Sequence, residues 1–173
     1  CNAKCKHCGS RAGEDCNFKD ELTTEEIEKA LQSIANKYNA NEILLNITGG
    51  EPLVRKDLFE VMKFARNLGY HWGMTTNAML INDENIEKMK ETGMTTISIS
   101  LDGLEKSHDE FRGVKGSFVK IIENIKRLKQ ANFLNYLQIT TVVNKLNIEE
   151  LEEMYQKMKE LQIDSWRIVN MDP

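Results

Sequence analysis

The chain has 173 residues, enough for one domain with a substantial core, and its 40% hydrophobic and 29% charged residues are typical of a globular protein. A net charge of −4 without a basic stripe argues against nucleic acid as its main partner. No apolar run approaches the roughly 20 residues that span a bilayer, so we expect no membrane segment.

Helical and strand-like patterns alternate along the chain. Thr23 or Thr24, followed by two glutamates, predicts the start of a helix, because a hydroxyl caps the first turn and acids favour the positive end of the helix dipole. After a polar loop over residues 1–22 we expect helix 23–38, strand 43–47, helix 57–68, strand 71–76, helix 83–92, strand 96–101, helix 117–130, strand 136–143, helix 148–161 and strand 165–169. Five strands separated by helices predict an α/β fold with a parallel sheet, since each parallel strand needs a crossover.

Unusual polar residues follow the predicted strands. They occupy positions 48–51, 76–77, 100–102, 143–144 and 170. In open parallel sheets and in parallel barrels alike, the carboxyl ends of the strands carry the active site. The sequence therefore places a functional site at this edge.

Three cysteines at the start of the chain form the first chemical motif, Cys1-x-x-x-Cys5-x-x-Cys8. Thiolates are soft ligands that suit zinc or iron–sulfur clusters. Three of them leave one iron of a four-iron cluster open to a small molecule, whereas a structural zinc site needs a fourth ligand, His7 or Cys16. His7 directly precedes Cys8, which is a poor position for binding the same tetrahedral zinc ion. We interpret Cys16 as a free thiol. Cysteines clustered at one end, with no secretion signal, indicate a metal site in a reducing cytoplasm.

Two further motifs follow strands. In Thr48-Gly49-Gly50-Glu51-Pro52 the glycines allow close backbone approach to a ligand, and Glu51 offers a carboxylate to a cation. In Ser98–Gly103, with Arg112 nearby, Ser and Asp suit sugar hydroxyls and Arg suits a carboxylate. Taken alone, each motif is better explained as an ordinary turn, the second with a surface salt bridge.

In combination these motifs resemble the radical S-adenosylmethionine (SAM) superfamily, over the whole chain and in family order. The cysteine loop resembles the family's three-cysteine motif, with an aromatic residue before Cys8, and residues 48–52 and 98–103 resemble its second- and fourth-strand motifs. The resemblance implies a partial (β/α)6 TIM-like barrel whose core domain spans 1–173. The first strand would precede Cys1 and the last helix would follow Pro173, so we expect the chain to be part of a longer protein.

The resemblance also implies the role of each residue. Cys1, Cys5 and Cys8 would bind a 4Fe–4S cluster, whose open iron would take the amine and carboxylate of SAM. The remaining cofactor contacts would be His7 against the adenine, Gly49, Gly50 and Glu51 on the methionine amine, Ser100 and Arg112 on its carboxylate, and Asn77 and Asp102 near the ribose or substrate. Many relatives have Gly where this chain has Ala78, which disfavours a turn of positive φ after Asn77. No substrate-facing catalytic residue is identified.

The segments 8–13 and 21–26 are similar to the SPASM subgroup, many of whose members modify ribosomally made peptides. This implies a radical enzyme that cleaves SAM to a 5′-deoxyadenosyl radical and forms a carbon–carbon or thioether cross-link in a peptide. It also implies auxiliary 4Fe–4S clusters in flanking domains, an electron donor such as flavodoxin or ferredoxin, and low-oxygen conditions. The alternatives are an anaerobic sulfatase-type maturase, a cofactor-biosynthesis enzyme of the same superfamily, or a non-catalytic iron–sulfur electron-transfer module.

Overall fold

The computed structural model describes residues 1–11 and 21–170, so Cys16 lies outside the described residues. Five parallel strands form one sheet in the order β1-β2-β3-β4-β5: β1 (Leu44–Ile47), β2 (His71–Thr76), β3 (Met94–Ser100), β4 (Tyr136–Val143) and β5 (Ser165–Asn170). The α-helices are α1 (Thr24–Ala35), α2 (Leu58–Asn67), α3 (Asp83–Glu91), α4 (Glu105–Arg112), α5 (Ser117–Ala131) and α6 (Leu151–Glu160). The predicted parallel α/β fold is confirmed.

Local sequence explains several of the helix boundaries. The Thr23 hydroxyl accepts a bond from the Glu26 amide, and the Glu26 carboxylate accepts one from the Thr23 amide, which makes a reciprocal capping box for α1. The helix ends at Ala35, before the predicted end at residue 38. The last predicted helix begins as a 3-10 turn at Ile148–Glu150 and becomes α6 at Leu151.

Helix α4 is absent from the sequence-based prediction. It has only eight residues, and no side chain caps its start. It ends at Gly113, whose φ of 69° lies in the left-handed region that glycine tolerates. The Asp109 carboxylate of α4 then accepts bonds from the amide of Phe118 and the hydroxyl of Ser117, so the turn into α5 is fixed from α4.

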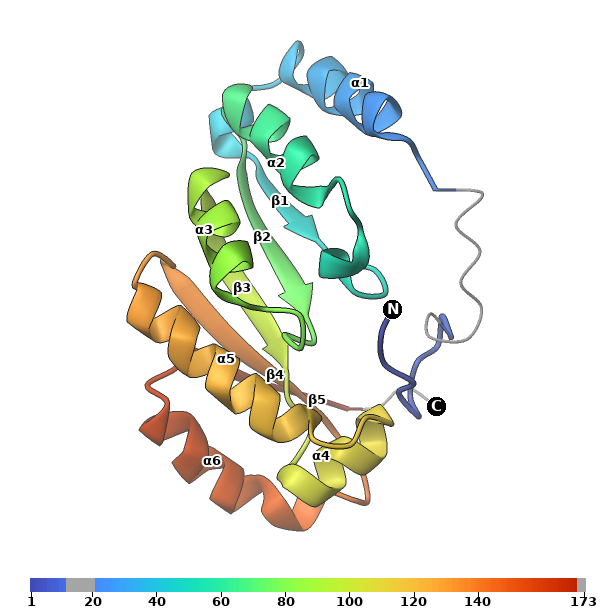
Figure 1. Cartoon of the computed structure of the whole chain (residues 1–173), viewed down its shortest axis with the longest axis vertical. Helices are drawn as coiled ribbons and strands as arrows, with labels where there is room; N and C mark the ends of the chain where they lie inside the picture. The colour runs from blue at the N-terminus through green and yellow to red at the C-terminus, as the bar shows by residue number, and fades with distance from the viewer. Residues whose placement is uncertain (12–20, 171–173) are drawn as a thin grey trace.

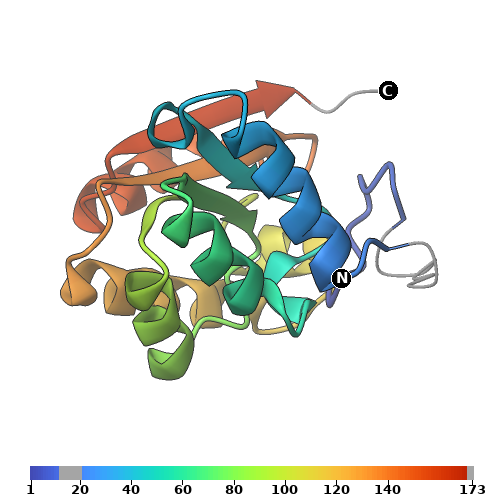
Figure 2. The same ribbon diagram turned by 90° about the horizontal axis from the view of Figure 1, so that it is seen from above.

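The two faces of the sheet differ in character. The helices lie along its outer side (Figures 1 and 2). Four of the side chains that β3 and β4 send to that side are buried and apolar: Ile97, Ile99, Leu137 and Ile139. The residues between them are polar and belong to the inner face. The core therefore lies between sheet and helices, and the inner face is left for function.

Figure 1 also shows the N-terminal segment beside the carboxyl ends of the strands. That edge is where the sequence places the functional site. Within the described parts of the chain, no helix has the length and apolar character needed to cross a membrane.

Candidate active site

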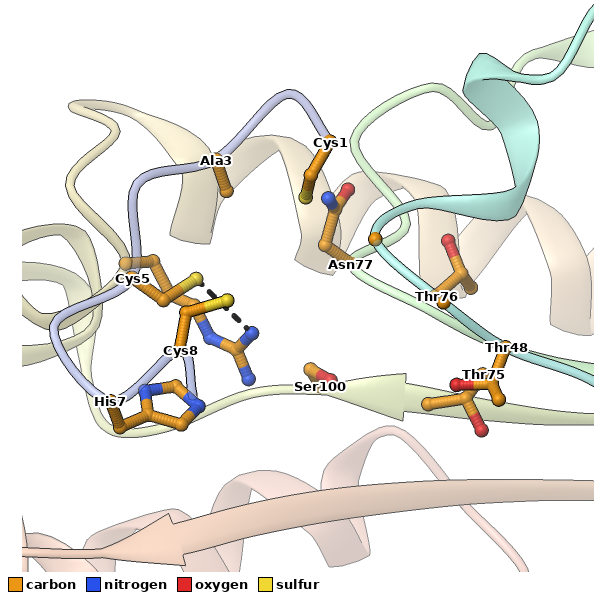
Figure 3. Close-up of a pocket in the computed structure, with 13 residues that line it drawn as sticks. Cys1, Ala3, Cys5, His7, Cys8, Thr48, Thr75, Thr76, Asn77 and Ser100 are labelled. Carbon is orange, nitrogen blue, oxygen red and sulfur yellow. Dashed lines mark hydrogen bonds between the residues drawn. The ribbon is translucent and has the colours of Figure 1, made fainter. Parts of the chain in front are cut away.

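The three cysteines of the first motif line one cavity of about 180 Å³ at the carboxyl ends of the strands. Figure 3 shows their side chains with the others of this cavity. Its walls come from the N-terminal loop, β1, β2, β3 and α4: Cys1, Ala3, Cys5, His7, Cys8, Thr48, Gly49, Gly50, Thr75, Thr76, Asn77, Ser100 and Arg112. Most of the predicted site residues therefore meet, whereas Glu51 and Asp102 lie outside the cavity wall.

The cysteine loop is held by the backbone of α4. The amide of Lys4 donates to the carbonyl of Arg112 (3.2 Å), and the amide of Lys6 donates to that of Phe111 (2.9 Å). Gly113 permits this approach, because a Cβ at that position would lie 2.7 Å from the Lys4 carbonyl oxygen. The sequence gives no signal for this contact, since α4 itself was not predicted.

The donor set fits an iron–sulfur cluster better than zinc. Cys1, Cys5 and Cys8 are half-buried and form no disulfide among the described residues. No three Cys, His, Asp or Glu side chains within 1–11 and 21–170 converge closely enough to hold a single metal ion. Three soft thiolates spread around one cavity suit a multi-iron cluster, whose ligands stand further apart than those of a lone ion.

Arg112 connects the cysteine loop to the end of β3. Its Nε and Nη2 bind the Asp102 carboxylate, and its Nη1 donates to Cys5 Sγ at 3.5 Å. A guanidinium has five N–H donors, so two remain for a ligand. The side chain is 12% exposed and lines the cavity.

Asp102 supports Arg112 instead of facing the cavity. Its side chain is fully buried, and Oδ1 accepts a bond from the Val142 amide at 2.6 Å. Its own amide donates to Nδ1 of His108. The carboxylate is occupied by Arg112 and by β4, so in this structure Asp102 positions Arg112, and its expected place near a ribose or substrate stays a prediction.

Glu51 ties the glycine turn after β1 to the end of β2. The residue is 5% exposed, and its carboxylate accepts bonds from the Thr76 hydroxyl (2.7 Å), the Asn77 amide (2.7 Å) and the Leu53 amide (3.2 Å). Burial raises the pKa of this carboxyl, although the hydrogen bonds from Thr76 and Asn77 oppose the shift. Three of its roughly four acceptor sites are used, so at most one remains for a cationic ligand.

Gly49 and Gly50, not the glutamate, form the cavity wall at this turn. Gly49 has a φ of 138°, and a Cβ built there would meet no atom within 4 Å. The glycine is thus required by the backbone conformation, and the space beside it is open to a ligand.

The turn after β2 has the backbone conformation that the sequence disfavours. Ala78 has a φ of 57°, in the left-handed region, which a residue with a Cβ adopts only with strain. Its carbonyl accepts a bond from Asn124 Nδ2 (2.9 Å), which helps to hold the turn. Asn77 itself lines the cavity and donates to Asn2 Oδ1 (2.7 Å), joining the turn to the cysteine loop.

His7 stacks on Phe111 of α4, with ring centroids 4.5 Å apart and planes 5° from parallel. Burial, and then the charge of Arg112, lower the pKa of this imidazole, which is therefore neutral at pH 7. Its Nδ1 is buried without a hydrogen-bond partner among the described residues. His7 thus lines the cavity while one of its ring nitrogens has no hydrogen bond within the part of the chain that the structure describes. Phe111, which orients it, is a site residue that sequence reasoning missed.

Comparison with known proteins identifies the family. The model of the radical SAM superfamily matches residues 1–158. The Fe-coproporphyrin III synthase of Methanosarcina barkeri is 42% identical over 118 residues, which cover 68% of this chain and 29% of that protein. The AdoMet-dependent heme synthase of Oleidesulfovibrio alaskensis is 35% identical (73% of this chain, 32% of that protein). The sporulation killing factor maturation protein SkfB of Bacillus subtilis is 29% identical (73% and 30%). The chain thus spans about a third of the length of these relatives.

Solved structures give the same fold. SuiB of Streptococcus suis bound to S-adenosylmethionine matches with a TM-score of 0.80 at 22% identity, covering 100% of this chain and 39% of that one. Native anSMEcpe with bound AdoMet matches with a TM-score of 0.84 at 21% identity, covering 99% of this chain and 49% of that one. The predicted partial-barrel architecture is confirmed by these neighbours.

Proposed function

Because this chain belongs to the radical SAM superfamily of enzymes, which use a 4Fe–4S cluster and SAM, we propose that its cavity holds both groups and that the whole protein abstracts hydrogen from a substrate C–H bond. Bound together, cluster and SAM supply reductive cleavage to methionine and a 5′-deoxyadenosyl radical. The observation that carries the proposal is the meeting of three thiolates, a glycine turn and Arg112 around one cavity.

Each side of the cavity then has a task. Cys1, Cys5 and Cys8 hold the cluster, leaving one iron for SAM. The two free N–H groups of Arg112, with the Ser100 hydroxyl, bind the SAM carboxylate, since a guanidinium and a hydroxyl both donate.

The SAM amine and adenine meet the opposite walls. The backbone at Gly49 and Gly50 binds the amine, and the one acceptor site of Glu51 that is not used within the protein accepts a further hydrogen bond from it. The ring of His7, fixed by Phe111, lies against the adenine, and Asn77 faces the ribose.

For the substrate we propose a ribosomally made peptide that receives a carbon–carbon or thioether cross-link. The matches to SkfB and SuiB support this class, and one SuiB structure is bound to its precursor peptide SuiA. A tetrapyrrole is the second candidate, because the relatives at 42% and 35% identity are an Fe-coproporphyrin III synthase and a heme synthase. Flanking SPASM-type domains with auxiliary clusters, a flavodoxin or ferredoxin as electron donor, and a low-oxygen cytoplasm belong to the same proposal.

The decisive experiment is anaerobic reconstitution of the full-length protein with iron and sulfide, followed by reductant and SAM. We expect an iron–sulfur absorption and EPR signal and the release of 5′-deoxyadenosine. Cys5→Ala should lose 5′-deoxyadenosine release and the iron of one cluster, with any auxiliary clusters left in place, whereas Cys16→Ala, the matched control outside the motif, should keep both. A full cluster without any 5′-deoxyadenosine would contradict the enzyme proposal, and activity retained in Cys5→Ala would contradict the ligand assignment.

A further inference from the structure

The side chains of β4 and β5 divide between the two faces of the sheet. Trp166 stacks with Tyr155 of α6 (centroids 6.5 Å apart), and its Nε1 donates to Thr141 Oγ1 at 2.9 Å. Trp166 and Thr141 therefore face the helices. Since side chains alternate along a strand, Thr140 and Arg167 face the opposite, inner side.

The inner face carries two rows of polar residues in register. One row pairs Ser100 with Thr140 and Thr140 with Arg167 across β3, β4 and β5. The second row is Thr75, Ser98, Gln138 and Ser165. Hydrogen bonds join the rows, because Ser98 and Thr140 share one at 3.0 Å and Gln138 Nε2 donates to both hydroxyls. We call these seven residues the inner wall.

The inner wall is continuous with the cavity of the cysteines. Ser100 ends the first row and Thr75 ends the second, and both line that cavity. Neighbouring strands are about 4.8 Å apart, so the backbone of Arg167 lies about 10 Å from that of Ser100. A molecule touching both would reach from the proposed SAM position to β5.

Arg167 is the single charged residue of the inner wall, whose other members are hydroxyls and an amide. It is exposed and has no ion pair or hydrogen-bond partner among the described residues. Four other arginines do have acceptors: Arg55 with Asp57, Arg66 with the carbonyl of Glu91, Arg112 with Asp102, and Arg127 with Asp83. A guanidinium with no partner within 1–11 and 21–170, lying beside neutral hydroxyls, attracts a carboxylate, which it can bind with two parallel hydrogen bonds.

We propose that Arg167 binds a carboxylate of the substrate and that the hydroxyls of the inner wall bind the polar groups between this carboxylate and SAM. The inference rests on the proposed function and specifies its substrate class: a polar molecule with a carboxylate near the C–H group that reacts. An acidic side chain of a peptide and a propionate of a tetrapyrrole both supply this chemistry.

The test uses the full-length reconstituted holoenzyme with two probes, coproporphyrin III and a hexapeptide with one central glutamate. The neutral controls are coproporphyrin III tetraamide and the same hexapeptide with glutamine. Binding is measured anaerobically by fluorescence titration for wild type, Arg167→Gln and Arg167→Lys. Arg127→Gln is the matched control, because Arg127 is an exposed arginine on the outer side. Circular dichroism checks the fold of each variant.

We expect wild type to bind at least one acidic probe and to prefer it to its neutral control. Arg167→Gln should weaken that binding about tenfold or more, Arg167→Lys should recover part of it, and Arg127→Gln should match wild type. Equal binding by Arg167→Gln and wild type, or no binding of either acidic probe, overturns the inference. The probe that binds distinguishes the two sources of the carboxylate. Release of 5′-deoxyadenosine by wild type tests the proposed function separately, so either statement can fail alone.

Discussion

Replacing Asp102 by Asn should destabilise the site severely, although the two side chains have nearly the same shape. Asn keeps an oxygen for the Val142 amide but loses the charge that faces Arg112, which is only 12% exposed. Removing one partner of a buried ion pair costs about 3–5 kcal/mol, and we take the lower end, about 3 kcal/mol, because Arg112 retains some solvent contact. Amide hydrogen exchange in β4, which Asp102 contacts directly, should then accelerate roughly 10²-fold.

The assay is hydrogen exchange of the full-length apoprotein at pH 7, read by mass spectrometry on peptides covering residues 136–143. Asp83→Asn is the matched control, since Asp83 also pairs with an arginine, Arg127, but the two side chains are 86% and 47% exposed. An exposed pair contributes at most about 1 kcal/mol, so exchange in β4 should not change. If Asp102→Asn accelerates exchange no more than Asp83→Asn does, Asp102 does not hold Arg112 in the way described.

Substitutions at three more positions test other parts of the site. Burial, and then the charge of Arg112, lower the pKa of His108 to about 4 from an unfolded value of 6.5. Between pH 4 and 6.5 the folded state therefore binds fewer protons than the unfolded state, and the stability of the wild type should fall as the pH drops through this range. The melting temperature of His108→Gln should fall less than that of the wild type over the same range. Gly113→Ala places a methyl 2.7 Å from the Lys4 carbonyl oxygen at a φ of 69°, which should displace the cysteine loop from α4. The cysteine thiols should then react faster with a thiol reagent and bind less iron. Thiol reactivity equal to that of the wild type would argue against docking of the loop on α4. Ala78→Gly should change stability by less than about 1 kcal/mol, because relief of the strained φ offsets the lost methyl, whereas Ala78→Val should lower the melting temperature clearly.

The strands and the order of the motifs could be predicted from the sequence because both are local patterns. Alternating apolar runs define the strands, and Gly49-Gly50 directly follows one of them. Helix α4 could not be predicted in this way, since eight residues without a side-chain cap give too little periodicity. Phe111 therefore went unnoticed, although it sets the orientation of His7.

The roles of the two site carboxylates depended on partners distant in the chain. The sequence predicts Asp102 near a ribose or substrate, but it does not show that the carboxylate binds Arg112 and the Val142 amide, which lies 40 positions away. Glu51 is engaged by Thr76 and Asn77 at the end of the next strand. A sequence shows that a carboxylate follows a strand, but only the assembled sheet shows which donors reach it first.

The docking of the cysteine loop on α4 has a consequence for the biogenesis of the protein. The loop leaves the ribosome well before α4 does, yet the backbone groups that hold it belong to Phe111 and Arg112. At about 5–20 residues per second, synthesis of the chain between the cysteine loop and α4 takes roughly 5–20 s. During that time the backbone groups of α4 that hold the loop are not yet present. We therefore expect stable insertion of the proposed cluster only after β3 and α4 have formed, and until then the thiols of the loop are exposed to oxidation and to competing metals.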